Sequence, residues 1–326
     1  MSNIKLGITL YCFTREYCRG EMSLEDCIRK AKEIGAEGYE IVATQMIPSY
    51  PYISDKFLGE IQAISQYYDI KPVSYGANMD RGMRGDRNLT EDEMLQMAIN
   101  DVKSANKMGC KIMREQFLLS PGAMARLAPY AEAYDVKVGI EIHNPETPNT
   151  PIMREYLEVF EKTGSKYLGF VPDFGLFATR PNKPMWDEAL EAGTPLEILE
   201  MAKEMRLNEV PLEEAMGRLA KAGATGPAFG ALQGMYGFVQ FRKDCTAELE
   251  GLKEIMPYCF HMHGKFHYLS EDLQEASIPY HKIMPVIEES DFEGYIVSEY
   301  EDHASGNAVE MTRRHIAMMK KLLGRS

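Results

Sequence analysis

The chain has 326 residues, of which 36 are basic and 49 acidic, so its formal net charge at pH 7 is −13. With 45% apolar and 26% charged residues, it has the composition of a globular protein and not of a long disordered segment. A surface this acidic repels a phosphate backbone, so nucleic acid is excluded as an expected partner.

The cysteine and hydropathy patterns predict a cytoplasmic protein that does not enter the membrane. The six cysteines show no CxxC spacing and no dense framework, which is typical of reduced thiols. No apolar run reaches about 18 residues, the length needed for a membrane-spanning helix. Residues 1–13 carry one basic side chain and no small-residue cleavage site follows, so they predict a buried strand and not a signal peptide.

Short β-rich runs alternate with amphipathic helical segments along the chain. Ser23 and Asp26 have capping-box spacing at the start of the first long helix, which Gly35 ends. Thr90 and Glu93 have the same spacing before a longer helix. In chain order we predict strand 5–11, helix 23–35, strand 38–42, helix 57–68, strand 72–77, helix 90–109, strand 111–115, helix 121–134, strand 136–143, helix 151–164, strands 168–173 and 259–263, helix 279–290, strand 294–299 and helix 308–323.

Eight strands separated by helices predict a parallel sheet, because parallel pairing needs a crossover connection. Eight such units close into a (β/α)8 barrel, also called a TIM barrel, which we expect to span residues 1–326 as one domain. A doubly wound open sheet is the alternative, but no glycine-rich nucleotide-binding turn follows the first strand. The barrel is therefore the predicted fold.

Residues 176–243 interrupt this alternation. They show helical patches at 194–205 and 211–222 and a glycine-rich run at 223–238 that does not match a phosphate-binding loop. We predict an insertion after the sixth strand. It is either a plain surface insertion or a lid or subunit-docking element, since loops at this end of a barrel border the active site.

The chemistry of such a barrel lies at the carboxyl ends of its strands. Side chains alternate with period two, so Glu141 and His143 share one face of their strand. His261, His263 and Lys265 form a second row of this kind. The polar residues found at strand ends are Glu40, Asn78, Glu115, Glu141, His143, Asp173, His261, His263, Lys265 and Glu299.

Three of these strand-end carboxylates, Glu141, Asp173 and Glu299, would repel one another without a positive centre between them. With His263 on the strand between the last two, they form a four-ligand set for one divalent ion. Three oxygens and one imidazole favour Mn²⁺, with Mg²⁺, Co²⁺ or Fe²⁺ as alternatives, and they favour Zn²⁺ less because no thiolate is present.

The remaining histidines have less specific positions. His143 is either a hydrogen-bonding neighbour of the ligands or a general base, because imidazole titrates near neutral pH. His261 lies deeper in its strand and is more typical of a structural residue. Four others are predicted on loops or helix surfaces: His267, His281, His303 and His315.

Four segments at these strand ends resemble the xylose isomerase-like barrels: Gly139-Ile-Glu141-Ile-His143, Phe170-Val-Pro-Asp173, His261-Met-His263-Gly-Lys265 and Ile296-Val-Ser-Glu299-Tyr. The resemblance spans nearly the whole chain. It implies that Glu141, Asp173, His263 and Glu299 bind the metal and that Lys265 contacts substrate.

Three further strand-end residues are expected to line the same substrate site: Glu40, Glu115 and His261. Two departures from the family pattern stand against a simple isomerase mechanism. Gly175 and Leu176 lie where relatives often have a histidine, and Phe266 lies where they often have an aspartate.

Within this superfamily, the insertion, the Glu-x-His pair and the segment GYEIVATQMIPSYP are similar to the large α subunits of bacterial C-glycoside deglycosidases. That similarity implies a small β subunit and a 3-keto C-glucoside substrate. It also implies a lyase reaction in which His143, or alternatively Glu141 or Glu299, removes the C2 proton. Aromatic residues near the insertion would face the aglycone or pack the insertion itself: Phe174, Phe177, Trp186, Tyr236, Phe238 and Phe241.

The main alternative is a ketose epimerase or aldose–ketose isomerase, or a related keto-sugar dehydratase. It would use the same ion, with Glu141 and Glu299 as bases. A barrel that only binds sugar or serves in assembly is a second alternative. An endonuclease role is disfavoured by the net charge and by the small number of strand-end histidines.

Overall fold

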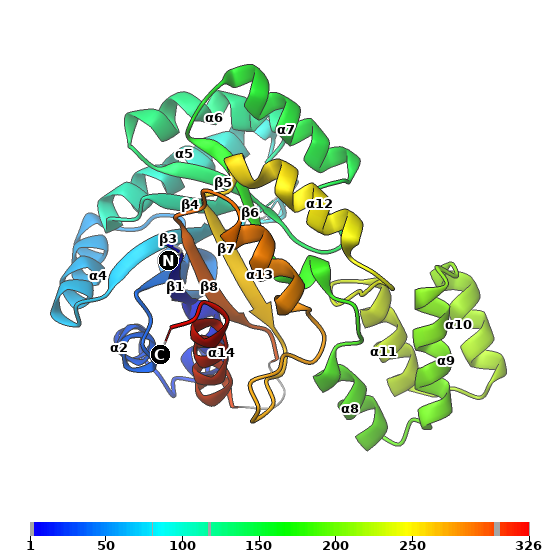
Figure 1. Ribbon diagram of the computed structural model, residues 1–326. Helices are drawn as coiled ribbons and strands as arrows, with labels where there is room; N and C mark the ends of the chain where they lie inside the picture. The colour runs from blue at the N-terminus through cyan, green and yellow to red at the C-terminus, as the bar shows by residue number, and fades with distance from the viewer. Residues whose placement is uncertain (1–2, 80, 117–118, 303–306, 326) are drawn as a thin grey trace.

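Eight parallel strands, with helices between them, form a barrel in the computed structural model (Figure 1), which describes residues 3–79, 81–116, 119–302 and 307–325. The strands are β1 (Lys5–Thr9), β2 (Gly38–Val42), β3 (Lys71–Ala77), β4 (Ile112–Glu115), β5 (Lys137–Ile142), β6 (Leu168–Pro172), β7 (His261–Phe266) and β8 (Tyr295–Tyr300). Neighbours in the sheet run parallel in the order β6-β5-β4-β3-β2-β1-β8-β7. The predicted TIM barrel is confirmed.

The barrel closes between β6 and β7, where single bridges replace a continuous ladder. Phe170 bridges Cys259, and Asp173 bridges His263, both in parallel. Gly169 lies at this seam, and a Cβ atom on it would come within 2.1 Å of the Tyr258 carbonyl oxygen. Glycine is therefore required for the two strands to approach closely enough to bring Asp173 beside His263.

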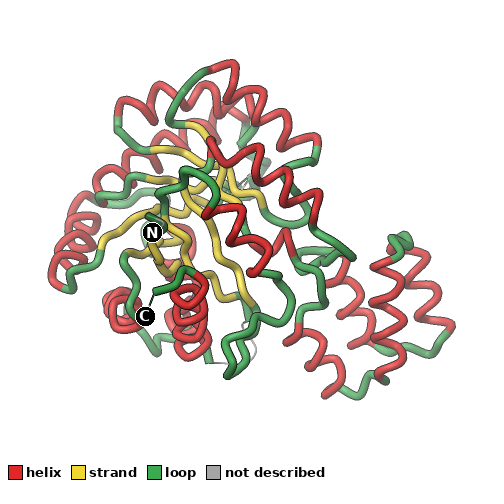
Figure 2. The backbone as a smooth tube through the Cα atoms, viewed as in Figure 1, coloured by secondary structure: helices red, strands yellow, loops and turns green. Residues whose placement is uncertain are grey.

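A ring of helices surrounds the strands, as Figure 2 shows. Ser23 and Thr90 cap their helices through the predicted capping boxes. The ring consists of α2 (Leu24–Ile34), α4 (Asp55–Tyr67), α5 (Glu91–Met108), α6 (Pro121–Ala133), α7 (Pro151–Thr163), α12 (Thr246–Ile255), α13 (Tyr280–Glu288) and α14 (Ala308–Leu322). Shorter helices are η1 (Leu10–Phe13), α1 (Thr14–Cys18), α3 (Ala43–Met46), η2 (Phe174–Phe177) and η3 (Met256–Tyr258). None of the described helices combines the length and the apolarity needed to cross a membrane.

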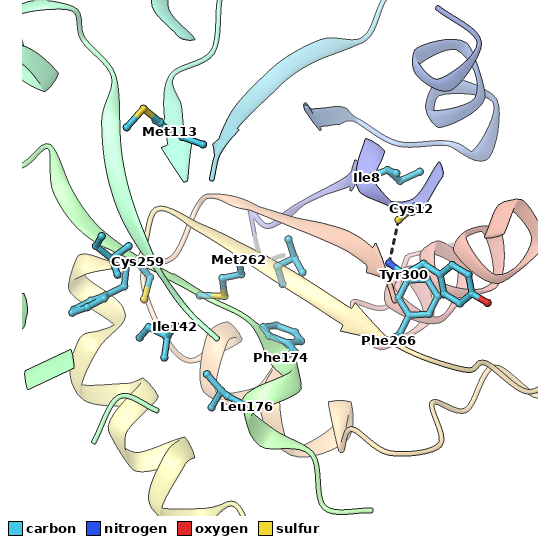
Figure 3. Close-up of a cluster of buried hydrophobic side chains, with 14 of the residues drawn as sticks. Ile8, Cys12, Met113, Ile142, Phe174, Leu176, Cys259, Met262, Phe266 and Tyr300 are labelled. Carbon is cyan, nitrogen blue, oxygen red and sulfur yellow. Dashed lines mark hydrogen bonds between the residues drawn. The ribbon is translucent and has the colours of Figure 1, made fainter. Parts of the chain in front are cut away.

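The apolar core lies between the strands and this helical ring. Met262 and Phe266 of β7 are buried there (Figure 3), and the Phe266 ring packs against Tyr300 with centroids 5.3 Å apart. Cys12 accepts a hydrogen bond from the Tyr300 backbone N–H at 3.2 Å. Because these alternate residues of β7 pack outward, His261, His263 and Lys265 are left to face the barrel interior.

The insertion after β6 is helical: α8 (Lys183–Glu191), α9 (Leu196–Leu207), α10 (Leu212–Lys221) and α11 (Gly226–Tyr236). Figure 1 shows α9 and α10 projecting away from the barrel. The glycine-rich run, for which no element was predicted, forms α11, whose residues Ala228, Ala231 and Leu232 are buried. Tertiary packing has overridden its low helix propensity.

Strands β1 and β7 differ most from the sequence prediction, and the boundaries of the other strands agree with it within one residue. β1 ends at Thr9, whose side chain accepts the Tyr11 N–H and starts η1, so residues 10 and 11 are not strand. β7 continues to Phe266 because it pairs with β8 through Tyr300, which brings Lys265 onto the strand. This extension places Lys265 in register with Glu299.

Candidate metal centre

Four inward-facing side chains converge at the carboxyl ends of β5, β6, β7 and β8. Glu141, Asp173, His263 and Glu299 each offer a ligand atom, and all four atoms lie within 4.8 Å of one another. Each side chain belongs to a residue that is at most 5% exposed. His263 Nδ1 lies 2.7 Å from Glu141 Oε1 and 3.3 Å from Glu299 Oε2. The structure thus brings together all four residues of the predicted ligand set.

Buried polar atoms in this cluster lack hydrogen-bond partners. Within the described residues Asp173 Oδ2, His263 Nδ1 and Glu299 Oε2 make no hydrogen bond, although a charged or titratable neighbour lies within 3.5 Å of each. A buried polar atom without a partner costs free energy, and such groups are usually paired or bound to a cation. Three carboxylate oxygens and one imidazole nitrogen are a donor set that divalent ions such as Mn²⁺ accept. The residues therefore fit a divalent metal ion.

Positive side chains offset part of the acidic charge. Arg114 Nη1 lies 3.8 Å from Glu141 Oε2, and Lys265 Nζ lies 3.0 Å from Asp173 Oδ2. Burial alone would raise the pKa of Glu141, but Arg114 and His263 lower it more, so the pKa falls below its ordinary value. Burial would also raise the pKa of Glu299. Lys265 and His263 lower it by more, so the pKa of Glu299 falls well below its usual range.

Asp173 is held differently. Burial raises the pKa of Asp173 well above its ordinary value, and Glu299 adds to this rise, although Lys265 opposes it. The Gly175 N–H donates to Asp173 Oδ1 at 2.6 Å, which leaves Oδ2 facing the cluster. A Cβ atom at Gly175 would lie 2.8 Å from Asp173 Oδ1. The departure from the family pattern at this position therefore has a physical reason: the backbone must approach the carboxylate closely.

His143 lies at the rim of the cluster and is half-buried. Its Nδ1 is 2.8 Å from the Asn144 carbonyl oxygen, and its Nε2 is 2.9 Å from Lys265 Nζ. Since a carbonyl only accepts, Nδ1 must carry the proton, and a neutral ring then has a lone pair on Nε2. Burial, followed by the nearby Lys265 charge, lowers the pKa of His143 below its ordinary value. A neutral imidazole with an unprotonated Nε2 is suited to accept a proton.

Sequence reasoning missed two charged residues of this centre. Arg114 is buried on β4, and Glu301 lies 2.8 Å from Lys265 Nζ through its Oε2. Strand parity carried a signal for Glu301, which follows Glu299 by two residues. Arg114 and Glu115 are adjacent on β4 and therefore point to opposite faces of the sheet. The register of β4 with its neighbours was needed to tell which of the two faces inward.

Three of the residues expected to contact substrate lie away from the four-ligand cluster. Glu40 and His261 are fully buried below His263, where Glu40 Oε2 lies 3.2 Å from His261 Nε2. Glu115 faces outward, because its neighbour Arg114 takes the inward position on β4. Burial, together with the charge of Asp101 on α5, raises the pKa of Glu115 well above its usual range. Only Lys265 among the expected substrate contacts lies at the centre itself.

Two of the histidines predicted on loops or helix surfaces are buried. His315 of α14 is fully buried and stacks on Phe266, with its Nδ1 2.8 Å from Ser298 Oγ. His267 is also buried, with its Nδ1 3.1 Å from the Glu301 carbonyl oxygen. His281 is exposed as predicted, and His303 lies outside the described residues.

One aromatic residue of the insertion reaches the centre. Phe238 is 72% exposed, and its ring centroid lies 5.9 Å from that of His143 at an interplanar angle of 65°. By contrast, Phe174, Phe177 and Phe241 are fully buried and pack the protein. Trp186 and Tyr236 are partly buried against the same core.

Comparison with protein families identifies the fold family. Residues 28–322 match the family described as "Xylose isomerase-like TIM barrel". The chain belongs to the xylose isomerase-like TIM barrels. Solved structures of similar shape include the IOLI protein with a bound zinc atom, at a TM-score of 0.59, 14% identity and 98% coverage of each chain. A 3-keto-D-glucoside 4-epimerase from E. coli superposes at 0.56 and 11% identity, covering 98% of this chain and 99% of that one.

Two curated relatives of this xylose isomerase-like barrel match it over nearly its full length. The 3'-dehydrocarminate deglycosidase alpha subunit of Microbacterium sp is 31% identical, with 98% of this chain and 95% of the relative covered. A C-glycoside deglycosidase alpha subunit of Arthrobacter globiformis is 28% identical, with 99% and 93% covered. The predicted resemblance to such subunits is confirmed at the level of homology.

Proposed function

We propose that this chain is the metal-dependent α subunit of a C-glycoside deglycosidase, a carbon–carbon lyase that releases aromatic aglycones from 3-keto C-glucosides. The observation that carries the proposal is His143, whose unprotonated Nε2 faces the four-ligand cluster from its rim. Full-length homology to deglycosidase alpha subunits supports the choice of reaction.

The substrate requires this chemistry, because a carbon–carbon bond to an aryl group is not cleaved by ordinary acid–base hydrolysis. A ketone at C3 makes the C2 proton acidic. When that proton leaves, the C2–H electron pair forms a C1=C2 double bond and the C1–aryl bond breaks. The same proton, returned to the aryl carbon, gives the free aglycone and an unsaturated keto sugar, so atoms and electrons balance.

Each residue at the centre has a role in this scheme. His143 Nε2 removes the C2 proton and, as an imidazolium, returns it to the leaving carbon. Lys265, an ammonium donor beside His143, binds a sugar oxygen. Glu141, Asp173, His263 and Glu299 hold the ion, with Glu141 and Glu299 also next to the reacting carbons. A divalent ion, most consistent with Mn²⁺, would stabilise the negative charge that develops at the ketone.

The insertion, residues 176–243, supplies a surface for the aromatic part of the substrate. Phe238 is exposed and packs edge-on against His143. The aryl group at C1 is one bond away from the carbon that His143 deprotonates, so it would lie beside this ring. Aromatic rings gain about 1 kcal/mol from such contacts beyond the area they bury. This supports the insertion acting as a lid.

A second, small subunit is part of the proposal, because the matching relatives are named as alpha subunits. The same insertion, or residues 48–52 after β2, would provide its docking surface. Tyr52 is 87% exposed there.

One incubation tests the proposed reaction. The protein is mixed with Mn²⁺ and the 3-keto form of an aryl C-glucoside, with and without candidate small subunits, and free aglycone is measured by chromatography. We expect aglycone release that depends on Mn²⁺. No release in any combination, together with epimerisation of a ketose, would replace the lyase with the epimerase or isomerase alternative.

A further inference from the structure

A second polar cluster lies directly below the metal centre, on the side away from solvent. It consists of Glu40 on β2, Ser74 on β3 and His261 on β7, all fully buried. His263 joins the two clusters: its Nδ1 faces Glu141 and Glu299, and its Nε2 lies 3.2 Å from Glu40 Oε1. One imidazole ring thus separates the ion ligands from Glu40.

We propose that Glu40 is a positioning residue that accepts a hydrogen bond from the Nε2–H of His263. This keeps the proton on Nε2 and leaves the Nδ1 lone pair free for the ion. This inference rests on the metal site of the proposed function and not on its reaction. Metal-binding histidines usually donate their second ring nitrogen to a carboxylate or carbonyl, which fixes the ring and its tautomer.

The tautomer follows from the groups on each side of the ring. A neutral imidazole carries one proton, and a nitrogen that binds a cation must be unprotonated. The oxygens of Glu141 and Glu299 beside Nδ1 are themselves ion ligands. The proton therefore belongs on Nε2, where Glu40 provides the acceptor. Without Glu40, a proton on Nε2 would be buried without a partner, and protonation of Nδ1 would compete with the ion.

Glu40 is itself held in place. Ser74 Oγ donates to Glu40 Oε2 at 2.7 Å, and the β2–β3 register sets these two residues side by side. His263 Nε2 is within hydrogen-bond distance of the same oxygen, Glu40 Oε2, at 3.3 Å, and it lies 3.2 Å from Glu40 Oε1. A buried carboxylate that is held by a neighbouring hydroxyl and lies within hydrogen-bond distance of a ring nitrogen has the geometry that orients a ligand.

An alternative occupant of the lower cluster is a second cation bound by Glu40, His261 and His263, whose ligand atoms also lie within 4.8 Å of one another. The structure favours the positioning role. Arg114 already adds positive charge near both Glu40 and His261. A second ion would also require His263 to bind cations through both nitrogens and lose its last proton.

Two substitutions at one position separate these roles. Glu40→Gln keeps an acceptor oxygen and removes the charge, whereas Glu40→Met removes both. Mn²⁺ affinity and stoichiometry are measured by competition with a chelator on purified full-length protein. We expect one ion per chain throughout, with affinity about 10–100-fold weaker in Glu40→Met and an intermediate loss in Glu40→Gln.

Asp101→Asn is the matched control, since it is also a buried acid-to-amide change but lies outside both clusters. It should leave Mn²⁺ affinity within about twofold. Urea unfolding of the ion-free variants reports folding separately from ion binding.

Affinity unchanged in both Glu40 variants would overturn the proposal, as would loss of stability alone. Two ions in the wild type and one in Glu40→Met would make Glu40 a ligand and also overturn it, and so would a wild type that binds no ion. Failure of aglycone release with these affinities intact would affect only the proposed reaction.

Discussion

Two clusters of buried carboxylates lie on opposite sides of the barrel wall, and their surroundings differ. The inner cluster, Glu141, Asp173 and Glu299, faces the cations of Lys265 and Arg114 and the imidazole of His263. The outer cluster, Asp101 of α5 and Glu115 of β4, lies between sheet and helix. There Asp101 accepts hydrogen bonds from the hydroxyls of Tyr50 at 3.1 Å and Tyr75 at 2.9 Å.

Protonation follows from these surroundings. Burial raises the pKa of Asp101 to about 7 despite its two tyrosine donors. Inside the barrel the same cost of burial is outweighed for Glu141 and Glu299, whose pKa values fall. Burial of an acid therefore does not by itself make a metal site. The inner cluster qualifies because Glu141 and Glu299 are held in the charged form and its ligand atoms converge beside the half-buried His143.

The largest expected effect is on ion binding at the inner cluster. Asp173→Asn removes one of four ligands, so Mn²⁺ affinity should fall more than about 100-fold. This exceeds the usual effect of changing a residue that only hydrogen-bonds to a ligand. Glu301→Gln, which changes a neighbour of Lys265 that is not in the ligand set, should lower it less than about tenfold. Titration with Mn²⁺ observed by electron paramagnetic resonance measures both, and equal losses would contradict the assignment.

Next in size is the effect of the proposed base. His143→Gln should lower the turnover of a 3-keto aryl C-glucoside by about 10²–10⁴-fold, the usual contribution of a general base. Mn²⁺ affinity should stay within about twofold, because His143 is not in the ligand set. Retention of more than a tenth of the activity would move the base to Glu141 or Glu299, as in the epimerase alternative.

The outer cluster predicts a pH dependence of folding. The pKa of Asp101 rises from 3.8 to about 7 on folding. Between these values the folded chain keeps a proton that the unfolded chain releases, so stability should fall as pH rises through this window. The loss should reach about 2–4 kcal/mol.

Asp101→Asn tests this contribution of Asp101, because an amide does not titrate there. Urea unfolding at pH 5 and pH 8 should show the variant gaining stability relative to wild type at the higher pH. Parallel curves for the two proteins would show that Asp101 titrates normally.

The smallest effect concerns access to the inner cluster. Phe238→Ala should raise KM for an aryl C-glucoside about fivefold, in line with about 1 kcal/mol for one aromatic contact. A 3-keto C-glycoside with a methyl aglycone serves as the matched control and should be nearly unaffected. Equal effects on both substrates would mean that Phe238 does not contact the aglycone.

Much of the fold followed from the sequence because alternating strands and helices allow few parallel arrangements. The convergence of the four candidate ligand residues followed from strand ends and parity. Arg114 was missed and Glu115 chosen instead, since both end the same strand and only the sheet register decides which faces inward. Helix α11 was missed because its glycines oppose a helix that packing nevertheless stabilises.

His315 shows a further limit of sequence reasoning. Its helix, α14, reads as a surface helix, yet the residue is buried and its Nε2 lies 2.7 Å from the Tyr280 hydroxyl. That hydroxyl donates to the Lys265 carbonyl oxygen. The hydrogen-bond partner of His315 Nε2 is Tyr280 on another helix, and no local sequence pattern predicts such a contact.

The position of a bound ion tests the account most directly. Crystals grown with Mn²⁺ and measured near the manganese absorption edge should show one anomalous peak per chain, about 2.0–2.3 Å from Glu141, Asp173, His263 Nδ1 and Glu299. No peak there, or a peak bound by Glu40 and His261 instead, would contradict it.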